Sequence, residues 1–98
     1  METQFYILLS LKTLGRFENY GQYFLGNNRE VAYELFSHLK GSKTLSEHYP
    51  LHFDLMETVD ELPVRIKSIC CTLEELAYNS KVIAKEIFRQ KNLKDYEE

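Results

Sequence analysis

Hydrophobic residues in this sequence change their spacing twice, from every second residue to every third or fourth. The first change falls between residues 5–25 and residues 27–40, and the second falls between residues 51–71 and residues 72–90. A period of two places apolar side chains on one face of a strand, and a period near 3.6 places them on one side of a helix. The sequence therefore predicts two strand regions, each followed by one helix.

The first strand region predicts a β-hairpin. Apolar side chains alternate from Phe5 to Leu11, which is typical of a strand with one buried face. Gly15 supplies a turn, because glycine adopts positive φ without strain. The aromatic stretch at residues 17–25 then predicts a second strand, which Gly21 weakens.

The first helix is expected to begin at Asn27. Its side chain can cap the helix, and Glu30 stands three residues later, as in a capping box. Apolar residues between Val31 and Leu39 then share one helical side, and Gly41 is expected to end the helix. Residues 42–50 are polar and predict a connecting loop.

The second strand region also predicts a hairpin. Residues 51–56 alternate between apolar and polar side chains, and residues 64–71 form a second run of the same kind. Asp60 and Glu61 are expected to make the turn. Pro63 stands at the start of the later strand, where a missing N–H group is tolerated.

Thr72 and Glu75 give the clearest local signal in the chain. The Thr72 hydroxyl can accept from the Glu75 N–H group while the Glu75 carboxylate accepts from the Thr72 N–H group, which is the capping box of a helix. The residues expected to form the buried stripe of this helix are Leu73, Leu76, Ala77, Ile83, Ala84, Ile87 and Phe88. Residues 91–98 predict a charged, frayed tail.

These elements predict an α+β fold of order ββαββα. Both helices have one apolar side, so we expect them to cover the same face of a four-stranded, mainly antiparallel sheet in a two-layer sandwich. The alternative treats residues 17–25 as a loop, which leaves a truncated ferredoxin-like order. Residues 1–98 are expected to form a single domain. The two halves also resemble each other, with Phe5-Tyr6-Ile7-Leu8 matching Phe53-Asp54-Leu55-Met56 at an offset of 48. Two ββα units require similar patterns, which explains the resemblance, and an internal duplication is the alternative.

Charge and cysteine content narrow the classes of function. The net charge of −3 and the pI of about 5.6 argue against a reader of nucleic-acid phosphates. Cys70 and Cys71 are adjacent and cannot join distant segments, so a reducing, cytoplasmic location is expected. The apolar run at residues 5–9 is too short for a signal sequence or a membrane span.

Histidine and cysteine give only partial signatures of chemistry. His48 and His52 have the four-residue spacing of a zinc-ligand pair, but the matching cysteine pair is missing, so no metal or cofactor is expected. Cys70 or Cys71 with either histidine would form a thiolate–imidazole pair, which is the alternative of a small enzyme. Buried structural cysteines are the favoured interpretation.

The sheet face opposite the helices is the candidate binding surface. A solvated antiparallel face normally carries polar side chains, whereas this one is expected to mix apolar residues with a compact charged set. Strict alternation places these residues there: Tyr6, Leu8, Phe24, His52, Asp54, Met56, Arg65, Lys67 and Ile69. The leading hypothesis is a non-catalytic binding or regulatory module that forms homo-oligomers, in particular homodimers, through this face. The simplest alternative is that the face carries scattered apolar residues exposed to solvent and binds nothing. Another protein or a small ligand is the next possibility, and a nucleic-acid adaptor is a further alternative.

Overall fold

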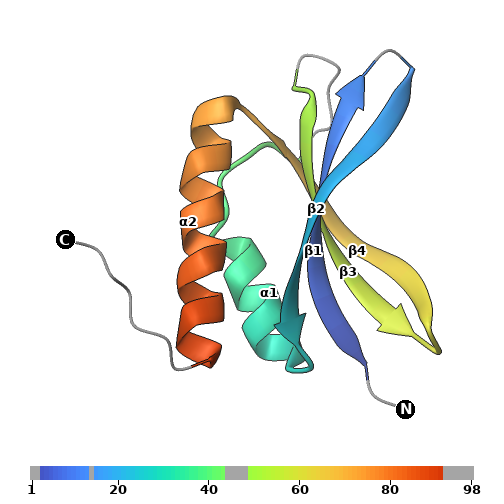
Figure 1. Ribbon diagram of the computed structural model, residues 1–98, viewed down its shortest axis with the longest axis vertical. Coiled ribbons are helices and arrows are strands. Elements are labelled where there is room, and N and C mark those ends of the chain that lie inside the picture. The colour runs from blue at the N-terminus through green and yellow to red at the C-terminus, as the bar shows by residue number, and fades with distance from the viewer. Residues whose placement is uncertain (1–2, 14, 44–48, 92–98) are drawn as a thin grey trace.

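The computed structural model describes residues 3–13, 15–43 and 49–91, and it has the order ββαββα (Figure 1). The elements are β1 (Gln4–Thr13), β2 (Arg16–Gly26), α1 (Arg29–Ser37), β3 (Leu51–Val59), β4 (Leu62–Cys71) and α2 (Leu73–Gln90). The strands form one antiparallel sheet in the order β2-β1-β3-β4, and both helices lie on the same side of it. The predicted fold is confirmed, and the strand at β2 excludes the truncated ferredoxin-like alternative. The tail after Lys91 lies outside the described residues.

Both hairpin turns use positive φ angles. Gly15 has φ of 78°, as expected for the turn between β1 and β2. Asp60 and Glu61 have φ of 51° and 67° and form the two-residue connection between β3 and β4. Two positive φ angles in a two-residue loop match the right-handed twist of the strands that it joins. The two hairpins extend away from the helices and diverge from each other (Figure 1).

The sheet is symmetric on exchange of the two halves of the chain. Its order places β1 and β3 in the centre and their hairpin partners at the edges. Ile7 pairs with Leu55, and these two residues are related by the sequence offset of 48. The pair therefore lies at the centre of the approximate symmetry. The internal duplication stays one of the two explanations for this symmetry. The helices do not share it in length, since α1 has 9 residues and α2 has 18.

A β-bulge in the second hairpin corrects the predicted faces of β4. Phe53 pairs with Ile69 and Leu55 pairs with Lys67, but Met56 then pairs with Arg65, so the register shifts by one residue at Ile66. An extra residue in one strand reverses the alternation beyond it. Lys67 and Ile69 consequently face the helices, and their predicted place on the opposite face is wrong.

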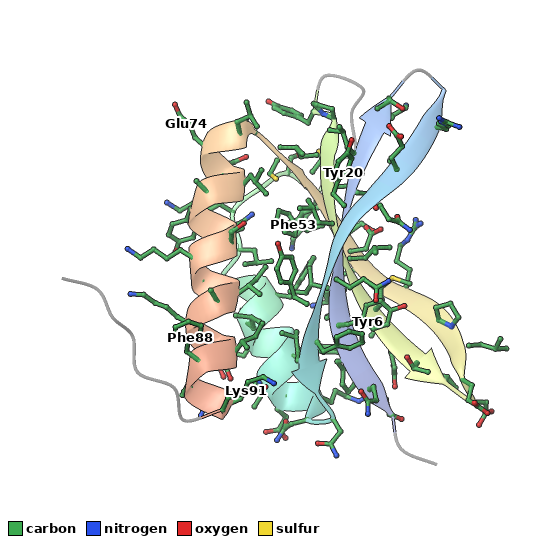
Figure 2. The ribbon with its side chains drawn as sticks, viewed as in Figure 1. Tyr6, Tyr20, Phe53, Glu74, Phe88 and Lys91 are labelled. Atoms are coloured by element: carbon green, nitrogen blue, oxygen red, sulfur yellow. The ribbon has the colours of Figure 1, made fainter. Side chains whose placement is uncertain are left out.

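The core lies between the sheet and the two helices. Phe53 is fully buried and points into this layer, as Figure 2 shows. Arg29 anchors the start of α1, because its guanidinium donates to the Glu57 carboxylate at 2.9 Å and lies 5.5 Å from the centre of the Phe5 ring. The buried members of the core are Phe5, Ile7, Leu25, Ala32, Leu35, Phe36, Leu51, Phe53, Leu55, Ile69, Cys71 and Ile83.

Helix α1 differs from its prediction at both ends. The cap is Asn28 rather than Asn27, and its side chain accepts from the Val31 N–H group at 3.0 Å. The helix ends at Ser37, before Gly41. Gly41 instead lets the loop pass close to β4, since a Cβ atom there would lie 2.7 Å from the Cys70 carbonyl oxygen.

Helix α2 has the predicted capping box, with Thr72 and Glu75 exchanging backbone–side-chain hydrogen bonds of 2.9 and 3.2 Å. Its buried side is rotated from the prediction: Leu76, Ile83 and Ile87 pack against the core, whereas Leu73 is 75% exposed. Ala77 and Ala84 are exposed as well. The centre of the buried side is polar, because Asn79 is fully buried beside Ile83. Within the described residues, no helix is long and apolar enough to cross a membrane.

Candidate functional site on the outer face of the sheet

The face of the sheet turned away from the helices, called the outer face below, carries an apolar row across three strands. Phe24 pairs with Tyr6, and Tyr6 pairs with Met56 on its other side. The rings of Tyr6 and Phe24 lie 5.7 Å apart, and Phe24 is 59% exposed. Arg65, the partner of Met56, continues the row onto β4. Three apolar side chains therefore stand in register on a face that no helix covers.

The next two rows of the outer face are mostly polar. Leu8 lies between Gln22 and Asp54 in the first of these rows, next to Tyr6 on the same face of β1. Ser10 lies beside His52 in the following row, and its hydroxyl donates to Asn19 at 3.2 Å. The outer face thus has an apolar end near the start of β1 and a polar centre.

Three side chains of β3 are buried although they point away from the helices. His52, Asp54 and Met56 have exposed fractions of 5, 7 and 9%. Neighbouring side chains cover this central strand: the Phe17 ring stands edge-on to His52 at 5.0 Å, and Arg65 lies 3.7 Å from the Asp54 carboxylate. Side chains of the flanking strands therefore cover the central strand on this face.

The polar centre contains two hydrogen-bonding atoms without partners. Within the described residues, His52 Nε2 and Ser68 Oγ are buried and have no hydrogen bond. Burial lowers the pKa of His52 below its usual value, and the charges of Lys12 and Arg65 act in the same direction, whereas Asp54 opposes the shift. The lowered pKa and the burial of His52 both favour the neutral form of the ring.

The outer face holds seven of the nine predicted residues. Tyr6, Leu8, Phe24, His52, Asp54, Met56 and Arg65 lie there, and Lys67 and Ile69 lie on the helix side. Phe17 was missed, because strict alternation from Phe24 places it on the helix side of β2, whereas its pairing with Lys12 places it on this face. The cause is a bulge at Tyr20 of β2, opposite Leu9 and Ser10, because an extra residue reverses the alternation beyond it.

Other exposed apolar side chains lie away from the outer face. Leu62 and Val64 are 66% and 45% exposed, and their pairing places them on the helix side of the β3–β4 hairpin. Leu73 stands at the first turn of α2, and Tyr20 occupies the bulge of β2. Exposed hydrophobic side chains of this size suggest that the protein has an interaction surface. On the outer face, Phe17 and Phe24 are exposed in this way.

The cysteines are poorly placed for nucleophilic chemistry. Cys70 pairs with His52 across the sheet, but both residues are buried, and the Cys70 thiol lies 3.7 Å from the Ser42 carbonyl oxygen, to which it donates. Cys71 faces the core, where burial and then the charge of Glu75 raise its pKa to about 11. Neither cysteine forms a disulfide. His48 lies outside the described residues.

Cys71 is expected to react slowly with thiol reagents. A pKa of about 11 leaves on the order of one thiolate in 10,000 at pH 7, compared with a few per cent for an unfolded cysteine. In a Cys70→Ala variant, we expect the native protein to be alkylated at least about a hundredfold more slowly than the urea-unfolded protein. Mass spectrometry measures both rates. Equal rates would show an accessible thiolate and would favour the enzyme alternative.

Within residues 3–13, 15–43 and 49–91, no three histidine, cysteine, aspartate or glutamate side chains come together in a group that could hold a metal ion. Comparisons with protein-family models, curated proteins and solved structures found no match to this chain. The assignment of function therefore depends on the geometry of the molecule itself.

Proposed function

We propose that this protein is a non-catalytic binding module that forms homodimers through the outer face of its sheet. The observation that carries the proposal is the row of Phe24, Tyr6 and Met56, extended by Leu8, on a face without a covering layer. Sheets in two-layer folds bury one face against helices and expose a polar second face. An apolar row on the second face is stabilised when another sheet packs against it.

Polar groups near the apolar row support the same proposal. Gln22 and Arg65 are exposed beside the apolar row, so a partner surface that covers the row also meets these polar groups. Groups that end without a hydrogen bond in a dry interface are unfavourable by about 1–3 kcal/mol each. A second copy brings serine, asparagine and glutamine side chains from its own polar rows, so it can satisfy these groups.

The size of the outer face fits a dimer of small subunits. Four strands about 4.8 Å apart, over roughly eight paired residues of 3.3 Å each, cover on the order of 500 Å² in projection. The relief of the side chains raises the accessible area toward the roughly 800 Å² per partner of a standard interface. A second copy is the partner we favour, because two-fold homodimers are the commonest assemblies. Two cysteines without a disulfide fit a reducing, cytoplasmic location.

Glutamate substitutions on the outer face test the proposal. Leu8→Glu combined with Phe24→Glu is expected to convert a dimer into a monomer at tens of micromolar protein, because carboxylates would be buried against the partner. Phe24 is preferable to Met56 for this purpose, since Met56 is 9% exposed and its replacement would also disturb folding. Sedimentation equilibrium gives the mass, and far-ultraviolet circular dichroism confirms the fold.

Leu73→Glu is the matched control, since Leu73 is 75% exposed on α2, far from the outer face. This variant is expected to keep the mass of the wild type. A wild-type monomer at the same concentration would refute self-association. A double variant that remains dimeric would place the interface on another surface.

A further inference from the structure

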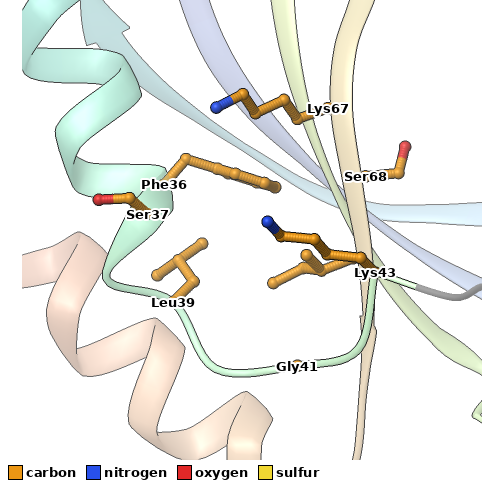
Figure 3. Close-up of a pocket in the computed structure, with 8 residues that line it drawn as sticks. Phe36, Ser37, Leu39, Gly41, Lys43, Lys67 and Ser68 are labelled. Atoms are coloured by element: carbon orange, nitrogen blue, oxygen red, sulfur yellow. The ribbon is translucent and has the colours of Figure 1, made fainter.

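A cavity of about 430 Å³ lies on the helix side of the sheet, beside the edge strand β4. The end of α1 forms one wall with Phe36, Ser37 and Leu39, and β4 forms the opposite wall with residues 67–69. Gly41 and Lys43 of the loop after α1 close it from below in Figure 3. Its volume is in the range of cavities that hold small organic ligands.

Two lysine side chains line this cavity. Lys43 extends from the loop and Lys67 extends from β4, both toward α1, with Phe36 between them (Figure 3). The Lys67 ammonium lies 5.1 Å from the centre of the Tyr33 ring. Among the described residues, neither lysine forms an ion pair, and no carboxylate lines the cavity. A local excess of positive charge stands out in a chain with a net charge of −3.

The rest of the lining is apolar, is already hydrogen-bonded, or points away from α1. Leu39 and Ile69 contribute aliphatic surface next to the Phe36 ring. The Ser37 hydroxyl donates to the Glu34 carbonyl oxygen at 2.6 Å, so it is occupied within α1. The Ser68 side chain points away from α1 in Figure 3. The groups left to recognise a ligand are therefore the two lysine ammonium groups and the apolar surface beside them.

The loop that carries Lys43 is held in place by its backbone. Asn79 of α2 accepts from the Lys40 N–H group at 2.7 Å and donates to the Lys40 carbonyl oxygen at 2.9 Å. Ser42 then exchanges two backbone hydrogen bonds with Cys70, of 2.8 and 3.0 Å. Gly41 makes this close approach to β4 possible. A fixed loop lowers the entropy lost when a ligand binds.

We infer that this cavity binds a small organic anion, with its negative charge attracted by Lys43 and Lys67 and its apolar body against Phe36, Leu39 and Ile69. The site lies on the opposite side of the sheet from the outer face, so the inference goes beyond the proposed function and is tested independently of it. A second cavity, between α1 and α2, is a weaker candidate. Glu34 and Glu86 line it together with Arg89, and Arg89 already donates to Glu86 at 3.1 Å.

The probes are 2-naphthoate and its neutral analogue 2-naphthamide, each titrated into the ¹⁵N-labelled protein. We expect naphthoate to shift the amide signals of Gly41, Lys43 and Ile69 and to bind about tenfold more tightly than naphthamide, which corresponds to two partly exposed charge pairs. Lys43→Met combined with Lys67→Met keeps the apolar stems and removes both charges. This variant is expected to bind the two probes with equal affinity and to leave the affinity for naphthamide unchanged.

Lys81→Met is the control for a general loss of positive charge, because Lys81 is exposed on α2 and does not line the cavity. It is expected to retain the preference for naphthoate. Equal affinity of the wild type for both probes, shifts spread over other surfaces, or an unchanged preference in the double lysine variant would each overturn the inference. The titration is repeated in the Leu8→Glu/Phe24→Glu variant, where the same result shows that the cavity does not depend on dimerisation.

Discussion

Replacing Leu55 with alanine is expected to lower the free energy of unfolding by about 3–5 kcal/mol. Leu55 is fully buried on the helix side of the central strand β3, where it pairs with Ile7 on one side and Lys67 on the other. The truncation removes apolar area from the core and leaves a cavity at the centre of the sheet, where neighbouring strands cannot close it. A domain of this length has a total stability of about 5–15 kcal/mol, so the loss is a large part of the whole.

Leu73→Ala provides the matched control for Leu55→Ala. Leu73 is 75% exposed, although its position in the hydrophobic pattern of α2 predicts burial. We expect this variant to change stability by less than about 0.5 kcal/mol. Urea unfolding at a single protein concentration measures both variants. Similar losses at the two positions would show that α2 packs with the rotation that the hydrophobic pattern predicts, and would contradict the buried face described above.

The order of the elements was predictable because each element has its own local signal. Alternating apolar residues mark β1 and β3, and the capping box at Thr72 marks the start of α2 in both the sequence and the structure. Two helices with one apolar side each need a shared sheet face, which determines the layers. The pairing of β1 with β3, and with it the strand order, was not predicted.

The candidate site was predicted only in part, because a bulge has no sequence signal as clear as a capping box. Arg65 remains on the outer face, but the extra residue at Ile66 turns Lys67 and Ile69 toward the helices. One shifted residue therefore moves a lysine from one proposed surface to the other. Lys67 becomes part of the cavity beside α1, a site that strict alternation could not predict.

The helix side of the sheet also depends on a polar residue that hydrophobic periodicity ignores. Asn79 interrupts the apolar stripe of α2, yet its side chain is fully buried. It forms hydrogen bonds with the backbone N–H and carbonyl groups of Lys40. Periodicity counts only apolar residues, so it rotates the expected buried side of α2 toward Leu73 and Ala77. The true side is centred on Asn79 and Ile83 because the loop after α1 needs partners for its backbone.

Asn79→Ala is expected to lower the free energy of unfolding by about 2–4 kcal/mol, because it leaves the Lys40 N–H and carbonyl groups without partners and opens a small cavity. Asn27→Ala is the control, since Asn27 is exposed and precedes the actual cap Asn28, and it should change stability by less than about 0.5 kcal/mol. Urea unfolding measures both values.

Hydrogen exchange separates the role of Asn79 in the loop from its role in global stability. In the wild type, the Ser42 N–H group donates to the Cys70 carbonyl oxygen and should be protected. If Asn79 positions the loop, the free energy of opening at the Ser42 amide falls by more in Asn79→Ala than the free energy of global unfolding does. At the Cys71 and Phe53 amides in the sheet, the free energy of opening then falls only by the global amount. Because Lys43 follows Ser42 directly, the same variant is expected to bind naphthoate more weakly. A variant that keeps its stability and its protection at Ser42 would show that the loop is held by its pairing with β4 alone.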